Sequence, residues 1–171
     1  LTKDRSFYKT LLVIALPVAL QQLISLAVVM LDNVMVGSLG DVSLSAVSQA
    51  NQVTVFFTFF VRGISGGAAL LISQYWGKKD TGRIKQIFSM TFITTVALAG
   101  TVTLFVFFFP SLVVKFFSNN SDILSEATDY IRIACFSYIL FAVSDTFIAM
   151  LRCVEIVKIT FVISIISFFT N

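Results

Sequence analysis

The residues most able to do chemistry are polar ones inside an apolar segment, residues 11–37. This segment contains Gln21, Gln22 and Asn33, and its only charged residue is Asp32. About 20 apolar residues are enough to cross a bilayer, so the segment predicts a transmembrane helix that carries a carboxylate. Because an acid inside a spanning helix is costly, it usually serves ion, proton or substrate handling. We therefore expect Asp32 to bind a cation or a proton.

Several polar residues of this segment share one helical stripe. At 100° per residue, Pro17, Gln21, Ser25 and Asp32 fall on the same side. Such a stripe is typical of a helix that faces a water-filled cavity. The alternative is that Asp32 only hydrogen-bonds a neighbouring helix as a structural contact. Pro17 removes one backbone donor, which predicts a kink or hinge at that point.

Two further charges fall inside apolar segments. Arg62 lies near the middle of one segment, and Asp145 lies in another, where Tyr138, Asp145 and Arg152 recur every seventh residue. A charge within the membrane should be paired or face water, so an Arg62–Asp145 ion pair is our hypothesis. The small residues at 65–69 favour close packing against another helix.

Composition indicates an all-α, polytopic membrane protein. Of 171 residues, 57% are hydrophobic and 12% are charged, whereas a soluble domain carries about 25% charged residues. The net charge of +3 therefore does not indicate a nucleic-acid partner. The absence of histidine from the sequence excludes His-based triads and metal sites, and no nucleophile sits beside a base. We expect no enzyme, no cofactor and no disulfide between Cys135 and Cys153.

The distribution of positive charge predicts the topology. The five connections carry three, none, four, one and two Lys or Arg residues. By the positive-inside rule, this alternation predicts that the N-terminus lies in the cytoplasm. We expect the protein to lie in the plasma membrane. We expect polar connections at Ser38–Gln52 and Ser111–Asp129, and a loop that starts with Gly77 as a helix C-cap. The first residue is not Met and the last lies in an apolar run, which predicts a fragment. The predicted spans, four complete and the start of a fifth, are 11–37, 53–76, 86–109, 130–151 and 159–171.

Three stretches carry a resemblance to a known family. They are ALPVALQQL, VMLDNVMVGSLGDVSLSAVS and SGGAALLISQYWGKKDTGRIKQ. Together they resemble the N-terminal half of a multidrug and toxic compound extrusion (MATE) antiporter, whose first helix has a proline and, fifteen residues later, an acid. Pro17 and Asp32 match that spacing, and the close of the fourth segment at Leu151 and Arg152 is also similar.

The resemblance implies a twelve-helix transporter built from two six-helix bundles, of which this chain would supply part of the first. It would export cationic or amphipathic small molecules by alternating access, driven by sodium or protons, within membrane lipid and with a missing C-terminal half. Asp32 matches the acid of the family's cation or proton site, and Asn171 resembles the first asparagine of the fifth helix. The weaker candidates for the substrate cavity are Gln21, Ser25, Asn33, Gln52, Arg62 and Asp145.

Three charged residues depart from the family pattern, namely Arg62, Asp145 and Glu155. Two alternatives therefore stay open. One is a flippase of the same superfamily for lipid-linked oligosaccharide or polysaccharide, which Arg62 favours because that cargo is anionic. The other is a membrane scaffold subunit that transports nothing.

Overall fold

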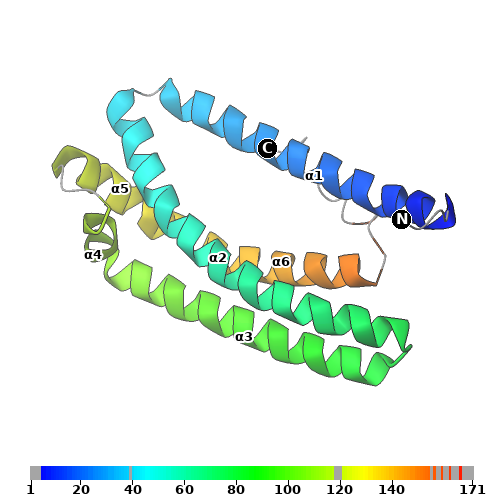
Figure 1. Ribbon diagram of the computed structural model, residues 1–171. Coiled ribbons are helices and arrows are strands. Elements are labelled where there is room, and N and C mark those ends of the chain that lie inside the picture. The colour runs from blue at the N-terminus through cyan, green and yellow to red at the C-terminus, as the bar shows by residue number, and fades with distance from the viewer. Residues whose placement is uncertain are drawn as a thin grey trace.

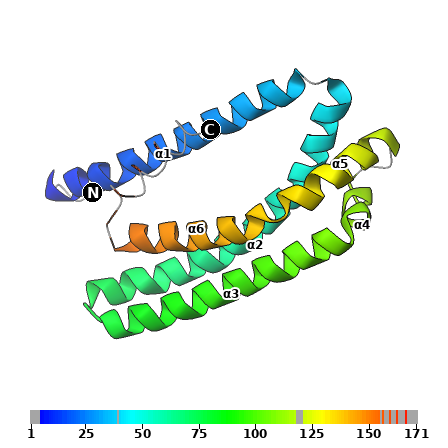
Figure 2. The ribbon, with the colours of Figure 1, turned by 180° about the vertical axis from the view of Figure 1, so that it is seen from behind.

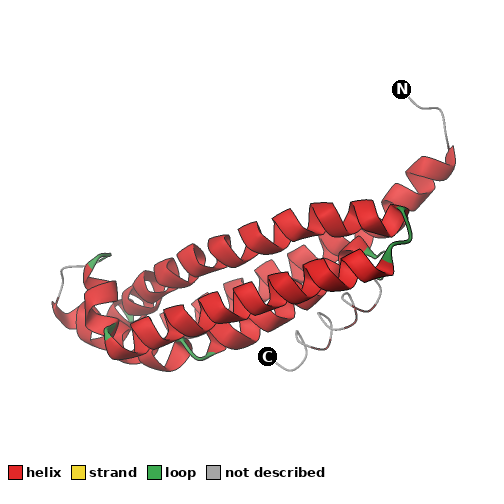
Figure 3. Cartoon of the chain, turned by 90° about the horizontal axis from the view of Figure 1, so that it is seen from below, coloured by secondary structure: helices red, strands yellow, loops and turns green. Residues whose placement is uncertain are grey.

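The computed structural model describes residues 5–38, 40–117 and 121–154, together with residues 156, 159, 162 and 166. These described residues form helices and no strand, and the connections between the helices are short (Figure 3). The chain is thus a helical protein, as its composition predicts. The helices are α1 (Arg5–Gly37), α2 (Asp41–Gly77), α3 (Thr81–Phe108), α4 (Pro110–Lys115), α5 (Ser121–Ala134) and α6 (Ser137–Cys153).

The core lies where α2 packs against α3, α5 and α6 (Figures 1 and 2). Small buried residues such as Ala99 of α3 and Ala142 of α6 let these helices approach closely. Larger side chains fill the space between them, and the rings of Phe57 and Tyr138 stack with centroids 4.7 Å apart. Three threonines of α3, Thr91, Thr95 and Thr103, are buried, and the Thr95 hydroxyl lies 2.9 Å from that of Thr146. Helix α3 therefore contributes one face to this core.

Helix α1 lies along the other helices but shares little surface with them (Figure 1). Only 6% of its most apolar window is buried, compared with 28% for α3. In a membrane this costs little, because lipid tails cover apolar side chains as well as another helix does. The helix runs through Pro17 without a break, and a hinge at that residue stays a prediction.

Three helices, α1, α2 and α3, are long and apolar enough to cross a membrane. A fourth crossing is formed if α5 and α6 are taken together, since they meet at a break with a bend of 52°. The predicted single span 130–151 is thus two helices. The break is stabilised by hydroxyl groups: Thr103 of α3 donates to the carbonyl of Cys135 at 3.1 Å, and Ser137 donates to that of Ala134 at 2.7 Å. Such contacts satisfy backbone groups that the break leaves outside the helices.

The prediction of polar connections was wrong at two places. Residues 41–52 belong to α2, whose 37 residues span about 55 Å, more than a bilayer needs. The polar residues there form helix turns that extend past the most apolar part of α2. Contacts such as the hydrogen bond from Ser43 Oγ to the carboxylate of Glu126, at 2.8 Å, hold these turns in place. Likewise, residues 111–129 contain most of α4 and the start of α5.

The turn between α2 and α3 also differs in detail from the prediction. Gly77 is the last helical residue, and Lys78 rather than Gly77 is the C-cap. The left-handed conformation belongs to Lys79, with φ of 58°. Asp80 then caps α3 by accepting the backbone N–H of Arg83 at 3.0 Å.

The positively charged connections lie at one end of the helices. The α2–α3 turn, with Lys78 and Lys79 in it and Arg83 and Lys85 in the first turns of α3, lies at the same end as the start of α1 and the end of α6 (Figure 1). The α1–α2 connection and α4 lie at the opposite end. The predicted fifth span 159–171, apart from three single residues, lies outside the described residues, as do Glu155 and Asn171.

Candidate functional site

An open cleft of about 820 Å³ lies between α1, α2 and α6. Small-molecule sites in proteins have volumes of roughly 300–1,000 Å³, so this cleft is large enough for a drug-sized compound. Its walls combine apolar and small residues with polar groups from all three helices. The polar residues that line it are Gln21, Gln22, Ser25, Arg62, Ser65, Ser73, Ser144, Asp145 and Arg152.

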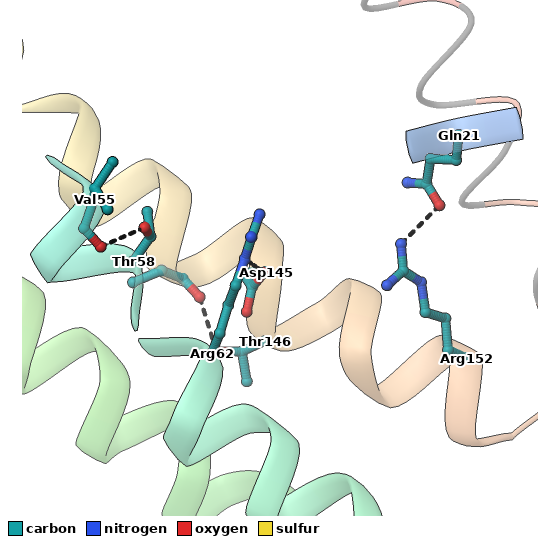
Figure 4. Close-up of polar contacts among 8 residues, drawn as sticks. Gln21, Val55, Thr58, Arg62, Asp145, Thr146 and Arg152 are labelled. Atoms are coloured by element: carbon teal, nitrogen blue, oxygen red, sulfur yellow. Dashed lines mark hydrogen bonds and ion pairs between the residues drawn. The ribbon is translucent and has the colours of Figure 1, made fainter. Parts of the chain in front are cut away.

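The predicted ion pair between Arg62 and Asp145 is present in this cleft (Figure 4). Arg62 Nε lies 3.8 Å from Asp145 Oδ1, with the Arg62 side chain 65% exposed and that of Asp145 21% exposed. This distance is longer than the 2.7–2.9 Å of a charge-assisted hydrogen bond. The guanidinium carbon also lies 6.0 Å from the ring centre of Phe141. The pair is therefore open on the cleft side.

A second polar contact joins α1 to α6 (Figure 4). The Arg152 guanidinium donates to Gln21 Oε1 at 2.8 Å, and Gln21 is almost fully buried. We did not predict this pair from the sequence. The sequence feature that could have pointed to it is the seven-residue row on α6, because all of its members make polar contacts. Tyr138 contacts Thr54 at 3.2 Å, Asp145 contacts Arg62, and Arg152 contacts Gln21.

The structure brings only some of the predicted site residues together. Gln21 and Ser25 of α1 line the cleft with Arg62 and Asp145, and Ser25 donates to the backbone carbonyl of Gln21 at 3.0 Å.

The remaining predicted site residues lie elsewhere. Asp32, Asn33 and Gln52 are exposed, and they are not among the described residues that line the cleft. From Gln21 to Asp32 the rise along the helix is about 16 Å, which separates the acid from the polar contacts of the cleft. The role of Asp32, and its partnership with Asn171, stay predictions.

Other reactive side chains offer no separate site. Cys135 is buried and Cys153 is partly buried, and both are free thiols. Within the described part of the chain, no three His, Cys, Asp or Glu side chains come together as a metal site. The cleft thus offers charged and hydrogen-bonding groups.

Comparison with known proteins identifies the family. The MatE family profile matches residues 17–171. The chain is 27% identical over 150 residues to the probable multidrug resistance protein NorM of Rhizobium meliloti (strain 1021). That match covers 85% of this chain and 32% of the relative, so the chain spans about a third of the relative's length. No solved structure matches. With nearly all of its residues matched by the family profile, the chain belongs to the MATE family.

Proposed function

We propose that this protein is part of a multidrug efflux transporter of the plasma membrane. It exports cationic or amphipathic compounds by sodium- or proton-coupled antiport, with its N-terminus in the cytoplasm. The observation that carries the proposal is the family match over residues 17–171. The cleft between α1, α2 and α6 supports it, because the MATE family comprises transporters and not enzymes, and a transporter needs a cavity for its cargo.

In this proposal Asp32 is the coupling residue. A carboxylate in a spanning helix can hold a proton or share a cation, and each state changes the cost of its apolar surroundings. If the coupling ion and a cationic substrate compete for this carboxylate, the release of one accompanies the binding of the other, which gives antiport. Asn171 and the asparagine-bearing remainder of the family's fifth helix would complete the site.

Helix α1 is suited to be the moving element. It is the least buried of the long helices, and the Gln21–Arg152 hydrogen bond is a contact that holds it against α6. Movement of α1 away from α6 would open the cleft at the end where Arg152 lies. A bend at Pro17 would allow part of the helix to move in this way, and transporter helices that line a cavity tolerate such kinks.

Export of a fluorescent organic cation tests this function. Cells that express the protein should expel the dye when a sodium or proton gradient is present, and Asp32→Asn should abolish coupled export because the amide cannot bind a proton or balance a cation. Asp41→Asn is the matched control, since Asp41 is an exposed acid at the start of α2. Unchanged export by Asp32→Asn would refute the assignment of Asp32.

A flippase for lipid-linked oligosaccharide or polysaccharide is the second candidate function. The observation that favours it is the charge of the cleft, whose described lining has two guanidinium groups, Arg62 and Arg152, and one carboxylate, Asp145. A flippase would translocate an anionic lipid-linked sugar in reconstituted vesicles and would not expel the organic cation. A scaffold subunit, the remaining alternative, would do neither.

A further inference from the structure

We propose that Arg62 selects substrates that carry a carboxylate, by binding that group in the cleft through its guanidinium. This inference rests on the proposed efflux function and names a substrate class for it: amphipathic compounds with a carboxylate beside their cationic or aromatic body. Arg62 is then a residue that determines specificity, and Asp145 is the group that orients it.

The geometry of the ion pair supports this role. At 3.8 Å from Asp145, the Arg62 guanidinium is held near the carboxylate without a short hydrogen bond to it. Most of the Arg62 side chain is exposed on the cleft side. A guanidinium presents five N–H donors in a planar fork that matches a carboxylate. The Arg62 guanidinium can therefore donate hydrogen bonds to a second carboxylate, on the ligand, while it stays beside Asp145.

The charge balance of the cleft points the same way. Its described lining carries one more positive charge than negative charge, and Arg152 is already engaged by Gln21. An anionic group on the ligand would offset this excess, whereas a purely cationic ligand would add to it. Arg62 is exposed whereas Arg152 is partly buried, so Arg62 is the guanidinium group available to the ligand.

Two neighbouring groups line the cleft beside Arg62. The ring of Phe141 lies beside the Arg62 guanidinium and lines the cleft, which provides an apolar face for an aromatic body. The Ser65 hydroxyl, one turn along α2 from Arg62, is 3% exposed and has no hydrogen-bond partner among the described residues. Ser65 also lines the cleft, but its oxygen is shielded from solvent, so Phe141 is the group that a ligand beside Arg62 would meet.

The competing interpretation is that Arg62 only neutralises Asp145. In that case the removal of Arg62 would leave an unpaired acid, and transport of every substrate would change together. The selective role predicts instead that only carboxylate-bearing substrates are affected. A pair of dyes that differ in this one group separates the two interpretations.

The experiment compares a rhodamine that has a free carboxylate with the methyl ester of the same dye. Export of both is measured in cells that express the protein or its Arg62→Gln variant. We expect Arg62→Gln to lower export of the free acid by about tenfold, as the loss of a hydrogen bond to a charged group would, and to leave export of the ester unchanged. Arg132→Gln is the matched control, because Arg132 lies against Phe107 and away from the cleft.

Three outcomes would overturn the inference. The first is an equal loss of export of both dyes in Arg62→Gln and again in Arg62→Lys, a variant that keeps the charge but not the planar fork. The second is unchanged export of the free acid. The third is a wild-type protein that expels the ester alone, which leaves the proposed function intact. If the wild-type protein expels neither dye, the efflux function itself fails.

Discussion

At the residue scale, the polar groups of α6 connect three helices. Tyr138 and Asp145 contact α2, whereas Arg152 contacts α1. In the membrane a polar side chain without a partner is costly, so such contacts fix which faces of the helices meet. The Gln21–Arg152 hydrogen bond stands out because α1 otherwise shares little surface with the other helices.

Gln21→Ala should loosen α1 at the end of the cleft where Arg152 lies. The change removes the acceptor of a charge-assisted hydrogen bond, which stabilises by about 1.5–3 kcal/mol. Cys153 lines the cleft and is partly buried, so its thiol should react faster with a membrane-permeant maleimide. The measurement uses a Cys135→Ala background.

Gln22→Ala is the matched control for that experiment. Gln22 is the adjacent amide and is exposed, so its removal should leave the labelling rate of Cys153 unchanged. Equal labelling rates in Gln21→Ala and the unmodified background would show that the hydrogen bond does not hold α1 in place.

At the element scale, the main feature is the break between α5 and α6. Within 121–154 the chain turns through 52° and still continues toward the opposite end of the molecule (Figure 2). The Cys135 carbonyl at the break accepts a hydrogen bond from Thr103 of α3. Because Thr103 is buried, this contact ties α3 to the bend.

Thr103→Val should therefore destabilise the protein. The valine keeps the shape of the side chain but removes this donor from the Cys135 carbonyl, which still accepts the backbone N–H of Tyr138, so the cost is about 0.5–1.5 kcal/mol. The midpoint of thermal unfolding in detergent should fall. In Thr101→Val it should stay nearly constant, since Thr101 is exposed and donates only within its own helix, to Ala97 at 2.9 Å. Equal shifts in the two variants would contradict a role for the contact at the bend.

At the scale of the whole molecule, positive charge gathers at one end of the helices. Four Lys and Arg residues lie in or beside the α2–α3 turn, and Arg152 lies at the same end. The opposite end carries Lys115 and several acids, including Asp41 and Glu126. By the positive-inside rule, we expect the first end to face the cytoplasm.

Cysteine labelling tests this orientation. In a background without Cys135 and Cys153, Ser111→Cys at the start of α4 should react in intact cells with a membrane-impermeant maleimide. Thr81→Cys, at the start of α3, should react only after the membrane is permeabilised. Both positions are exposed, so a permeant maleimide should label both and serves as the control. The reverse pattern would invert the topology.

The sequence by itself determined the class of the protein, its family and one ion pair. Long apolar segments in a chain with few charges can only be stable as membrane helices. The seven-residue row on α6 and the lone Arg62 of α2 predicted the ion pair that the structure contains. These predictions depend on local pattern and on the high cost of charge in lipid, which are both readable along the chain.

Only the tertiary structure decided where the helices end, where they bend and which polar residues share a cleft. Polar turns such as 41–52 continue α2 because they pack against α5, and hydropathy does not contain that information. Likewise, the sequence placed Asp32 and Gln21 on one stripe, but the helical rise separates them, and only Gln21 reaches the cleft. The partner of Gln21 is Arg152, 131 residues away in the chain. Such a contact is set by how the helices pack, and no local pattern specifies it.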